Sequence, residues 1–211
     1  MACPERNDKV KAFTRISWLD FHLHGGDPPD VNHPGNVTVP LQIIKKATWG
    51  AADSIIDLVH RHAVISEDNE TYLRNCINEV IQNVEDHAQS GFGAVCCARY
   101  LATPQKIRVA IVDSGLGIGT TLARRHPEIK NAEHALARVV QGGISAKSRP
   151  NNLGVGISNL WGHITQPLNG EIFIITEDVI GYNDRGGRLH AGPLGARFGG
   201  TGVFFTVPVA R

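Results

Sequence analysis

The chain has 211 residues, of which 42% are hydrophobic, so it holds enough apolar material for the core of one ordinary domain. Its 21 basic and 20 acidic residues leave a formal net charge of +1, which excludes a strong field of one sign for holding nucleic acid or anionic lipid. Because no apolar run is long enough to cross a membrane and no signal-peptide pattern opens the sequence, we expect a cytoplasmic protein.

The first region, residues 1–40, is irregular. Ala12–His24 is predicted to be a strand, and the proline-rich stretch Gly25–Pro40 a loop or arm. From Leu41 to His62 the apolar residues recur mostly at steps of three and four, which predicts an amphipathic helix. We therefore expect a second region, residues 41–211, to form the folded domain.

A second helix is expected to begin after Ser66, whose side chain is suited to an N-cap. Glu67 and Asp68 put negative charge in the first turn, where the helix dipole favours it. The apolar face of this helix is predicted to be Tyr72, Cys76, Val80 and Val84.

After Gly91 the hydrophobic period becomes that of strands, with short helices and glycine-rich loops between them. The expected strands are Phe92–Leu101, Lys106–Val112, Glu171–Thr176 and Val203–Val209. The expected helices are Ala132–Val140 and Gly156–Ile164. Gly181–Gly200 is expected to be a hairpin or loop. This order predicts an α/β (α+β) two-layer sandwich, with helices packed on one face of a mixed β-sheet.

The four cysteines match no zinc-binding pattern. Adjacent Cys96 and Cys97 would point to opposite faces of their strand, so a disulfide between them is not expected. Reduced and partly buried thiols are the favoured interpretation.

A polar row interrupts the inward-facing second helix. Glu79, Asn83 and His87 follow one another at single-turn spacing and would share one face. A buried polar row is unfavourable unless a ligand satisfies it. An asparagine oxygen suits a Mg²⁺ ion that also binds phosphate, and Glu79 could accept a proton from an attacking hydroxyl or water. For His87, a structural role and a phosphate contact are equally good alternatives, and Glu79 could also be a solvated helix residue.

Asp113 directly follows an apolar strand and opens a loop that contains Gly115, Gly117 and Ile118. An aspartate at a strand end can accept a hydrogen bond from an exocyclic amine, and the glycines let the loop pass close to a flat ring. On its own this pattern is common.

The polar loop from Gln141 to Ser158 contains Lys147 and Arg149, which could contact phosphate or could be ordinary solvated charges. Gly154 and Gly156 open a helix, whose backbone N–H groups would attract phosphate. Further along, Thr201 follows Gly199-Gly200 before the last strand, where its hydroxyl could support Asp113.

Taken in order, E-x-x-x-N-x-x-x-H-A, D-x-G-x-G-I, G-x-G and G-T resemble the N box and the three glycine boxes of the GHKL superfamily, which includes gyrases, heat-shock chaperones, histidine kinases and anti-sigma-factor serine kinases. The resemblance runs from about Leu41 to the C-terminus and implies a Bergerat-type ATP-binding fold. It implies that Asn83 binds Mg²⁺, that Asp113 reads adenine, and that Gly142–Leu153 covers the phosphates. The implied ATP-binding residues are Asn83, His87, Asp113, Gly115, Gly117, Ile118, Lys147, Ser148, Gly154, Val155, Gly156 and Thr201, with Glu79 as the catalytic residue.

The resemblance implies Mg²⁺-dependent ATP binding with ATP hydrolysis or transfer of the phosphoryl group to a protein, as in a regulatory serine/threonine kinase. Two alternatives stay open: a non-catalytic, ATP-gated interaction module, and the ATP-binding module of a larger sensor kinase. A protein partner is expected, as substrate or effector, and a homodimer is allowed. Neither nucleic acid nor a membrane is an expected partner.

Overall fold

The computed structural model describes residues 37–44, 50–88, 90–91, 93–102, 105–144 and 156–209, which all belong to one compact unit, Val37–Arg211. Several expectations therefore lie outside the described residues, among them the strand at Ala12–His24 and most of the loop Gly142–Leu153. The expected site residues that lie outside the description are Lys147, Ser148, Gly154 and Val155.

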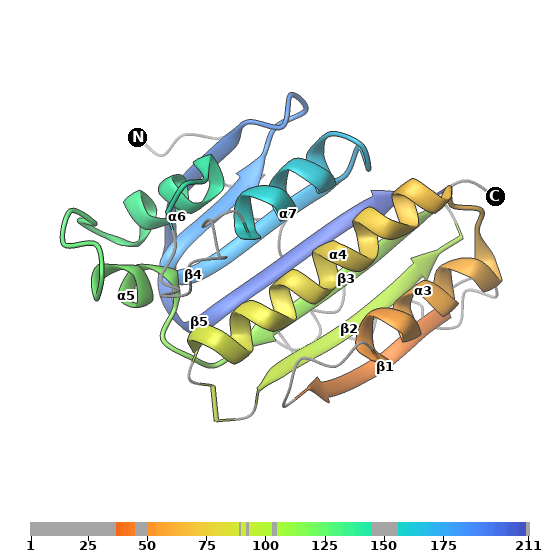
Figure 1. Cartoon of the computed structure of the whole chain (residues 1–211), viewed down its shortest axis with the longest axis horizontal. Coiled ribbons are helices and arrows are strands. Elements are labelled where there is room, and N and C mark those ends of the chain that lie inside the picture. The colour runs from red at the N-terminus through yellow and green to blue at the C-terminus, as the bar shows by residue number, and fades with distance from the viewer. Residues whose placement is uncertain are drawn as a thin grey trace. The chain divides into compact units, whose positions relative to one another are not determined.

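A five-stranded sheet, in the order β1-β2-β3-β5-β4, forms one layer of the unit (Figure 1). Its strands are β1 (Val37–Ile44), β2 (Ala94–Leu101), β3 (Lys106–Asp113), β4 (Glu171–Asn183) and β5 (Leu189–Pro208). Every pair of described neighbours is antiparallel, so the expectation of a mixed sheet is wrong. The helical crossover does make β3 and β4 run in the same direction, but β5 inserts between them and pairs antiparallel with both.

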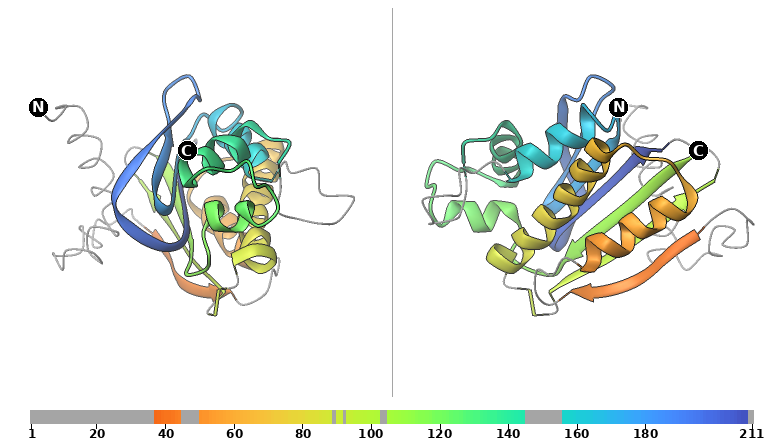
Figure 2. Two further views of the ribbon diagram at one scale, coloured as in Figure 1. Left: turned by 90° about the vertical axis from the view of Figure 1, so that its left-hand side faces the viewer. Right: turned by 45° about the vertical axis from the view of Figure 1, so that its right-hand side comes forward.

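The helices form the second layer and cover one face of the sheet (Figures 1 and 2). They are α3 (Gly50–His62), α4 (Glu67–Asn83), α5 (Ile118–Ala123), α6 (Ala132–Gln141) and α7 (Gly156–Thr165), and a single π-helical turn, η1 (Val84–Ala88), extends α4. The two-layer α+β sandwich is thereby confirmed. The helices predicted at Ala132–Val140 and Gly156–Ile164 are also confirmed.

The first part of the predicted helix Leu41–His62 is wrong, because Leu41–Ile44 belongs to strand β1. β1 is an edge strand, and its register with β2 shifts between Val39 and Gln42, where Pro40 falls. An edge strand with a bulge is where a sheet tolerates proline, since proline has no N–H to donate. The described residues therefore begin at Val37, within the stretch expected to be an arm, and the helix begins at Gly50.

Helix α4 lies across the sheet between α3 and α7 (Figure 1). Its predicted N-cap is confirmed, because Ser66 Oγ accepts a hydrogen bond from Asn69 N at 3.3 Å. Of the predicted apolar face, Cys76, Val80 and Val84 are buried and Tyr72 is half-buried. The remaining buried positions of the helix are Leu73, Ile77 and Ile81.

The core fills the space between the two layers. Its largest fully buried side chains come from helices and strands alike: Phe205, Ile55, Ile56, Leu73, Ile77, Ile107, Ile111, Leu136, Leu160, Ile164, Ile172 and Ile174. Burial of each such side chain contributes about 1.5–3 kcal/mol relative to leaving it exposed. The core thus joins β3 to α4 and α7, the elements that carry Asp113, Glu79 and Gly156.

Strands β4 and β5 form the hairpin expected for Gly181–Gly200, with a turn from Asp184 to Arg188. The indole N–H of Trp161 in α7 donates to the carbonyl of Gly187 at 2.8 Å and ties the turn to the helical layer. Both strands are longer than the sequence pattern indicated, because β4 continues past Thr176 and β5 begins at Leu189.

The described cysteines are free thiols. Cys96 is buried and its neighbour Cys97 is partly exposed, as expected for residues on opposite faces of a strand. Burial raises the pKa of Cys76 and of Cys96 to about 12, and that of Cys97 to about 11. These thiols are therefore poor nucleophiles near neutral pH.

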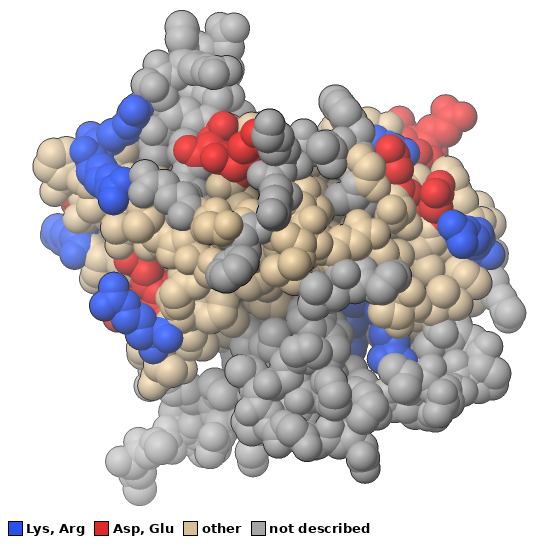
Figure 3. Space-filling view, turned by 90° about the horizontal axis from the view of Figure 1, so that it is seen from below, with Lys and Arg blue, Asp and Glu red and all other residues tan. Residues whose placement is uncertain are grey.

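On the face shown in Figure 3, acidic and basic side chains of the described residues are interspersed. Among the helices that the structure describes, none is both long and apolar enough to span a bilayer.

Candidate functional site

Asp113 lies at the end of β3, in a row of residues that crosses the sheet. It pairs with Ala94 in β2, and Thr201 in β5 pairs with Thr176 in β4. The neighbouring pair Val112–Gly202 joins β3 to β5, so Asp113 and Thr201 fall at adjacent register positions. The motif at Asp113 and the motif at Thr201 are far apart in the sequence. They thus meet in the middle of the sheet, at the C-terminal end of β3.

The carboxyl group of Asp113 is buried, with the residue only 6% exposed. Burial raises the pKa of Asp113, and hydrogen bonds from the backbone of Gly115 and Thr201 partly offset this rise. The N–H of Gly115 donates to Asp113 Oδ1 at 2.7 Å. A buried carboxylate fixed by backbone donors can accept one more hydrogen bond, and an amine donor from a ligand would stabilise its ionised form.

Gly200 is required next to Asp113 for two reasons. Its φ of +113° lies in a region that side chains other than glycine rarely adopt. A Cβ atom at this position would overlap the Asp113 carbonyl oxygen and lie 2.8 Å from Asp113 Oδ1. The glycine therefore lets β5 approach the end of β3 closely enough for Thr201 to contact Asp113.

The loop after Asp113 is fixed from β4. The N–H of Ile118 donates to Thr176 Oγ1 at 2.8 Å, and the same hydroxyl lies 3.4 Å from the Gly200 carbonyl oxygen and 3.4 Å from Thr201 Oγ1. Thr176 is completely buried. One hydroxyl can donate once and accept twice, so all three contacts can be made together.

The second part of the site is the C-terminal half of α4, where Glu79 and Asn83 are both partly buried. Glu79 packs against Gly156, the first residue of α7, because a Cβ atom on Gly156 would overlap the Glu79 carboxylate and lie 2.9 Å from its Cδ. Within the described part of the chain, neither the Glu79 nor the Asn83 side chain has a hydrogen-bond partner. Both groups are therefore available for a ligand.

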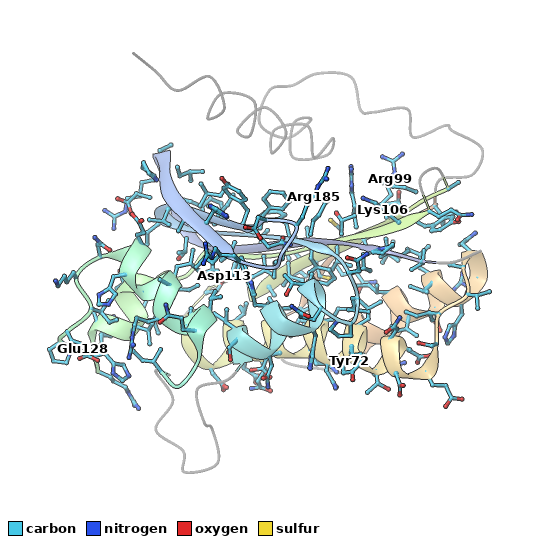
Figure 4. The ribbon with its side chains drawn as sticks, turned by 90° about the horizontal axis from the view of Figure 1, so that it is seen from above. Tyr72, Arg99, Lys106, Asp113, Glu128 and Arg185 are labelled. Carbon is cyan, nitrogen blue, oxygen red and sulfur yellow. The ribbon has the colours of Figure 1, made fainter. Side chains whose placement is uncertain are left out.

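These two parts belong to the same end of the unit. Helix α4 continues into η1, and the chain then reaches Ala94, the partner of Asp113. On the way, Ser90 Oγ lies 3.3 Å from Ser114 Oγ, so the segment after the helix contacts the loop after β3. Figure 4 shows Asp113 at one end of the sheet and Lys106, the first residue of β3, near the other.

The expectation that His87 shares one face with Glu79 and Asn83 stays a prediction, because the regular α-helix does not extend to His87. The α-helix ends at Asn83, and His87 lies in the π-helical turn η1, which has a wider repeat than an α-helix. Its side chain lies outside the described residues. Single π-helical turns are frequent at functional sites, and this one ends where the chain turns toward Asp113.

The start of the polar loop also contacts α7. Gly142 caps α6 with a φ of +84°, and a Cβ atom there would lie 3.0 Å from Ser158 Oγ. The loop therefore leaves α6 close to the first turn of α7, beside the Glu79–Gly156 contact.

A magnesium site made by the protein alone is not evident: the described residues contain no group of three or more His, Cys, Asp or Glu side chains able to hold a metal ion. The oxygen donors of Asn83 and Glu79 fit a different mode. Mg²⁺ usually keeps several waters and binds substrate phosphates, and it takes only one or two oxygens from the protein.

Sequence reasoning did not identify Thr176 and its neighbour Glu177. Both were hidden because the apolar run EIFIIT predicts an ordinary strand ending at Thr176. The available signal was the polar break Thr-Glu-Asp inside an otherwise apolar strand, since a fully buried strand rarely contains three consecutive polar residues.

No protein-family model matches the chain, and no curated protein matches it.

Proposed function

We propose that this domain binds ATP together with Mg²⁺ and catalyses ATP hydrolysis or transfer of its terminal phosphoryl group to a protein partner. The observation that carries the proposal is the meeting of separate motifs at one end of the unit, where Asp113 contacts Gly200 and Thr201 and Glu79 contacts Gly156. This arrangement supports the resemblance to the GHKL superfamily, and the Bergerat-type fold is part of the same proposal.

Asp113 is proposed to accept a hydrogen bond from the exocyclic amine of adenine. Guanine carries a carbonyl oxygen at the corresponding position, and two acceptors facing each other repel. A buried site built to accept a donor rejects the analogue that lacks it, because the buried group is then left unpaired. The burial of Asp113 therefore supports selectivity for adenine over guanine.

Asn83 and Glu79 are proposed to serve the phosphate side. The side-chain oxygen of Asn83 would hold the Mg²⁺ ion, which would neutralise charge on the phosphate oxygens. Glu79, one helical turn away, would accept the proton of the attacking water or hydroxyl group. Phosphoryl transfer depends mainly on positioning and charge stabilisation, so the same residues suit either acceptor.

The test is nucleotide binding and turnover by the whole chain. We expect calorimetry to detect ATP binding that needs Mg²⁺, exceeds GTP binding, and is weakened by Asn83→Ala. We expect Glu79→Gln, which keeps the side-chain volume against Gly156, to retain ATP binding and to lower turnover by about 10²-fold or more. Asp57→Asn, which changes an exposed carboxylate of α3, is the matched control and should alter neither.

The outcomes separate the candidate functions. ATP binding without turnover in the wild type would replace the enzyme with a nucleotide-gated interaction module, or with the ATP-binding module of a larger sensor kinase. Absence of ATP binding, with the chain folded, would overturn both.

A further inference from the structure

Glu177 has an unusual backbone and an unusual carboxyl group. Its φ of +53° lies in the left-handed region, which is unfavourable for a residue that is not glycine or asparagine. Its Oε2 atom is buried and, within the described part of the chain, has no hydrogen-bond partner. Strain and an unsatisfied polar atom at one residue are a reason to ask what that residue does.

Helix α5 begins directly after the loop and has no cap of its own. Its N-cap position is Gly117, which has no side chain to accept a hydrogen bond from the first turn. Strand β4 supplies the acceptors instead: Thr176 Oγ1 accepts the N–H of Ile118 at 2.8 Å, and Glu177 Oε1 accepts the hydroxyl of Thr120 at 2.6 Å. A carboxylate near the first turn also interacts favourably with the helix dipole. Thr176 and Glu177 thus cap α5 from another element.

Gly117 and Gly119 leave space for the side chains of Thr176 and Glu177. A Cβ atom on Gly117 would lie 2.7 Å from Glu177 Cγ and 3.0 Å from Thr176 Oγ1. A Cβ atom on Gly119 would overlap Glu177 Oε2 and would lie 3.0 Å from Ala132 Cα. These two glycines therefore provide space for Glu177, whatever they contribute to a ligand.

Thr176 also contacts the other loop of the site, through the Gly200 carbonyl oxygen and Thr201 Oγ1. The pair Thr176–Glu177 is consequently in contact with both segments that surround Asp113: the segment Gly115–Thr121 that follows it and the segment Gly200–Thr201 beside it. Among the described residues, Asp113 itself is hydrogen-bonded through its side chain to both segments, and Thr176 contacts both from β4.

We infer that Thr176 and Glu177 are positioning residues that hold the loop after Asp113 against Gly200–Thr201 and thereby set the selectivity for the base. This inference rests on the proposed function for its ligand, but the holding of the loop is a property of the ligand-free protein. The strained backbone of Glu177 is retained because it directs the carboxylate behind Gly117 and Gly119. Loss of either side chain lets the loop shift relative to Asp113, so the site still accommodates a nucleotide but distinguishes adenine from guanine less well.

The first experiment measures ATP and GTP affinities by calorimetry for Thr176→Val and Glu177→Gln. Valine keeps the shape of Thr176 without its hydroxyl, and glutamine keeps the length of Glu177 without its charge. We expect the ratio of ATP to GTP affinity to fall by about tenfold for Thr176→Val, because the backbone N–H of Ile118 loses its acceptor. For Glu177→Gln we expect a fall of about threefold. Asp178→Asn, the next residue of β4 and an exposed one, should leave the ratio unchanged.

The affinity ratio discriminates between positioning and general support of the fold. A residue with only a structural role would lower the melting temperature and leave the ratio of the folded protein at its wild-type value, and that result would overturn the inference. Glu177→Gly adds a second discrimination, because glycine relieves the positive φ while it removes the carboxylate. We expect this variant to be at least as stable as the wild type and yet to lose base selectivity, whereas retained selectivity would count against any role for the carboxylate.

The second experiment needs no nucleotide. Amide hydrogen exchange of the ligand-free protein should show faster exchange at Ile118–Thr121 in Thr176→Val and Glu177→Gln than in the wild type and in Asp178→Asn. Unchanged exchange would show that the pair does not hold the loop. If the wild type binds no nucleotide, the proposed function fails, while this second measurement still decides whether the pair holds the loop.

Discussion

Around Asp113, contacts run through backbone groups and short side chains, whereas the Glu79 carboxylate packs on Gly156 without a hydrogen bond between them. The first region is fixed before any ligand arrives, because moving Asp113 would break hydrogen bonds to Gly115 and Thr201. In the second region the polar groups lie on α4, and no hydrogen bond to a described residue orients their ends. A site built this way would recognise the base by a preformed shape and would orient its catalytic groups only when the phosphates and the metal ion arrive.

The comparison predicts that adding one methyl group lowers stability in the first region, whereas in the second region it lowers turnover and leaves stability nearly unchanged. In Gly200→Ala the new Cβ meets backbone at a positive φ, and neither can move cheaply. We expect the free energy of unfolding in urea to fall by on the order of 3 kcal/mol and nucleotide binding to be lost. Gly199→Ala is the control, since nothing lies within 4 Å of its added Cβ. Equal stability of the two variants would mean that the contact with Asp113 is not tight.

In Gly156→Ala the atoms nearest the new Cβ all belong to the Glu79 side chain, whose end can rotate away. We expect the free energy of unfolding to change by less than about 1 kcal/mol, while turnover falls by about 10²-fold because the carboxylate is displaced. Gly162→Ala, in the same helix with nothing within 4 Å, should keep full turnover and gain up to about 1 kcal/mol of stability. Full turnover in Gly156→Ala would separate Glu79 from the chemistry.

The buried carboxyl of Asp113 predicts a pH dependence confined to the first region. Its pKa is raised, mainly by burial, so the free protein takes up this proton at a higher pH than an ordinary aspartate does, whereas an amine donor favours the ionised form. ATP affinity should therefore fall as the pH is lowered through this raised pKa. Asp113→Asn should remove both this dependence and about tenfold of the preference for ATP over GTP. Calorimetry across the acidic range measures both.

The raised pKa of Asp113 also determines how the free energy of unfolding of the ligand-free protein depends on pH. The contribution of Asp113 to the free energy of unfolding is complete below its unfolded-state pKa, about 3.9, and is lost as the pH rises through the folded-state value. A wild-type protein whose stability, relative to that of Asp113→Asn, rises with pH over this range would contradict the burial of the carboxyl.

The smallest effect is expected far from both regions, where Arg74 of α4 is paired with Asp53 of α3 and with Glu70. The pKa of Glu70 is lowered, chiefly by its hydrogen bond from Arg74, so its contribution to stability is present above the unfolded-state pKa and is lost as the pH falls through the folded-state value. Glu70→Gln should lower the free energy of unfolding at neutral pH by less than about 1 kcal/mol and leave nucleotide affinity unchanged. Weakened ATP binding in this variant would show that the surface pairs communicate with the site.

The sequence predicts elements that are defined by a local pattern better than elements that are defined by contacts between distant segments. Periodicity located α4, α6 and α7 because their apolar faces repeat over several turns. It failed at Leu41–Ile44, where the apolar residues also fit a helix and only pairing with β2 selects the strand. It also missed α5, whose first turn is capped from β4 and therefore carries no local start signal.

Among the site residues, those that recur in short motifs were found, and those defined by contacts across the sheet were not. Asp113, Gly200 and Thr201 are recognisable from the residues beside them in the sequence. Thr176 and Glu177 become visible only when β4 is placed next to β5 and opposite the loop after β3. The π-helical turn at Val84–Ala88 escaped for a related reason, because a change of helical repeat over one turn leaves little trace in composition.

The central position of β5 has a consequence for how the protein is made on the ribosome. Until Val203–Pro208 has emerged, β3 has an open edge and the first half of β4, Glu171–Ile174, lacks its partner in the described sheet, although both have already been synthesised. Long-range pairing of this kind is slow, and an unpaired hydrophobic edge is prone to aggregation. The sheet of a nascent chain therefore stays divided, and the proposed base-binding site is complete only after the last described strand has paired with β3.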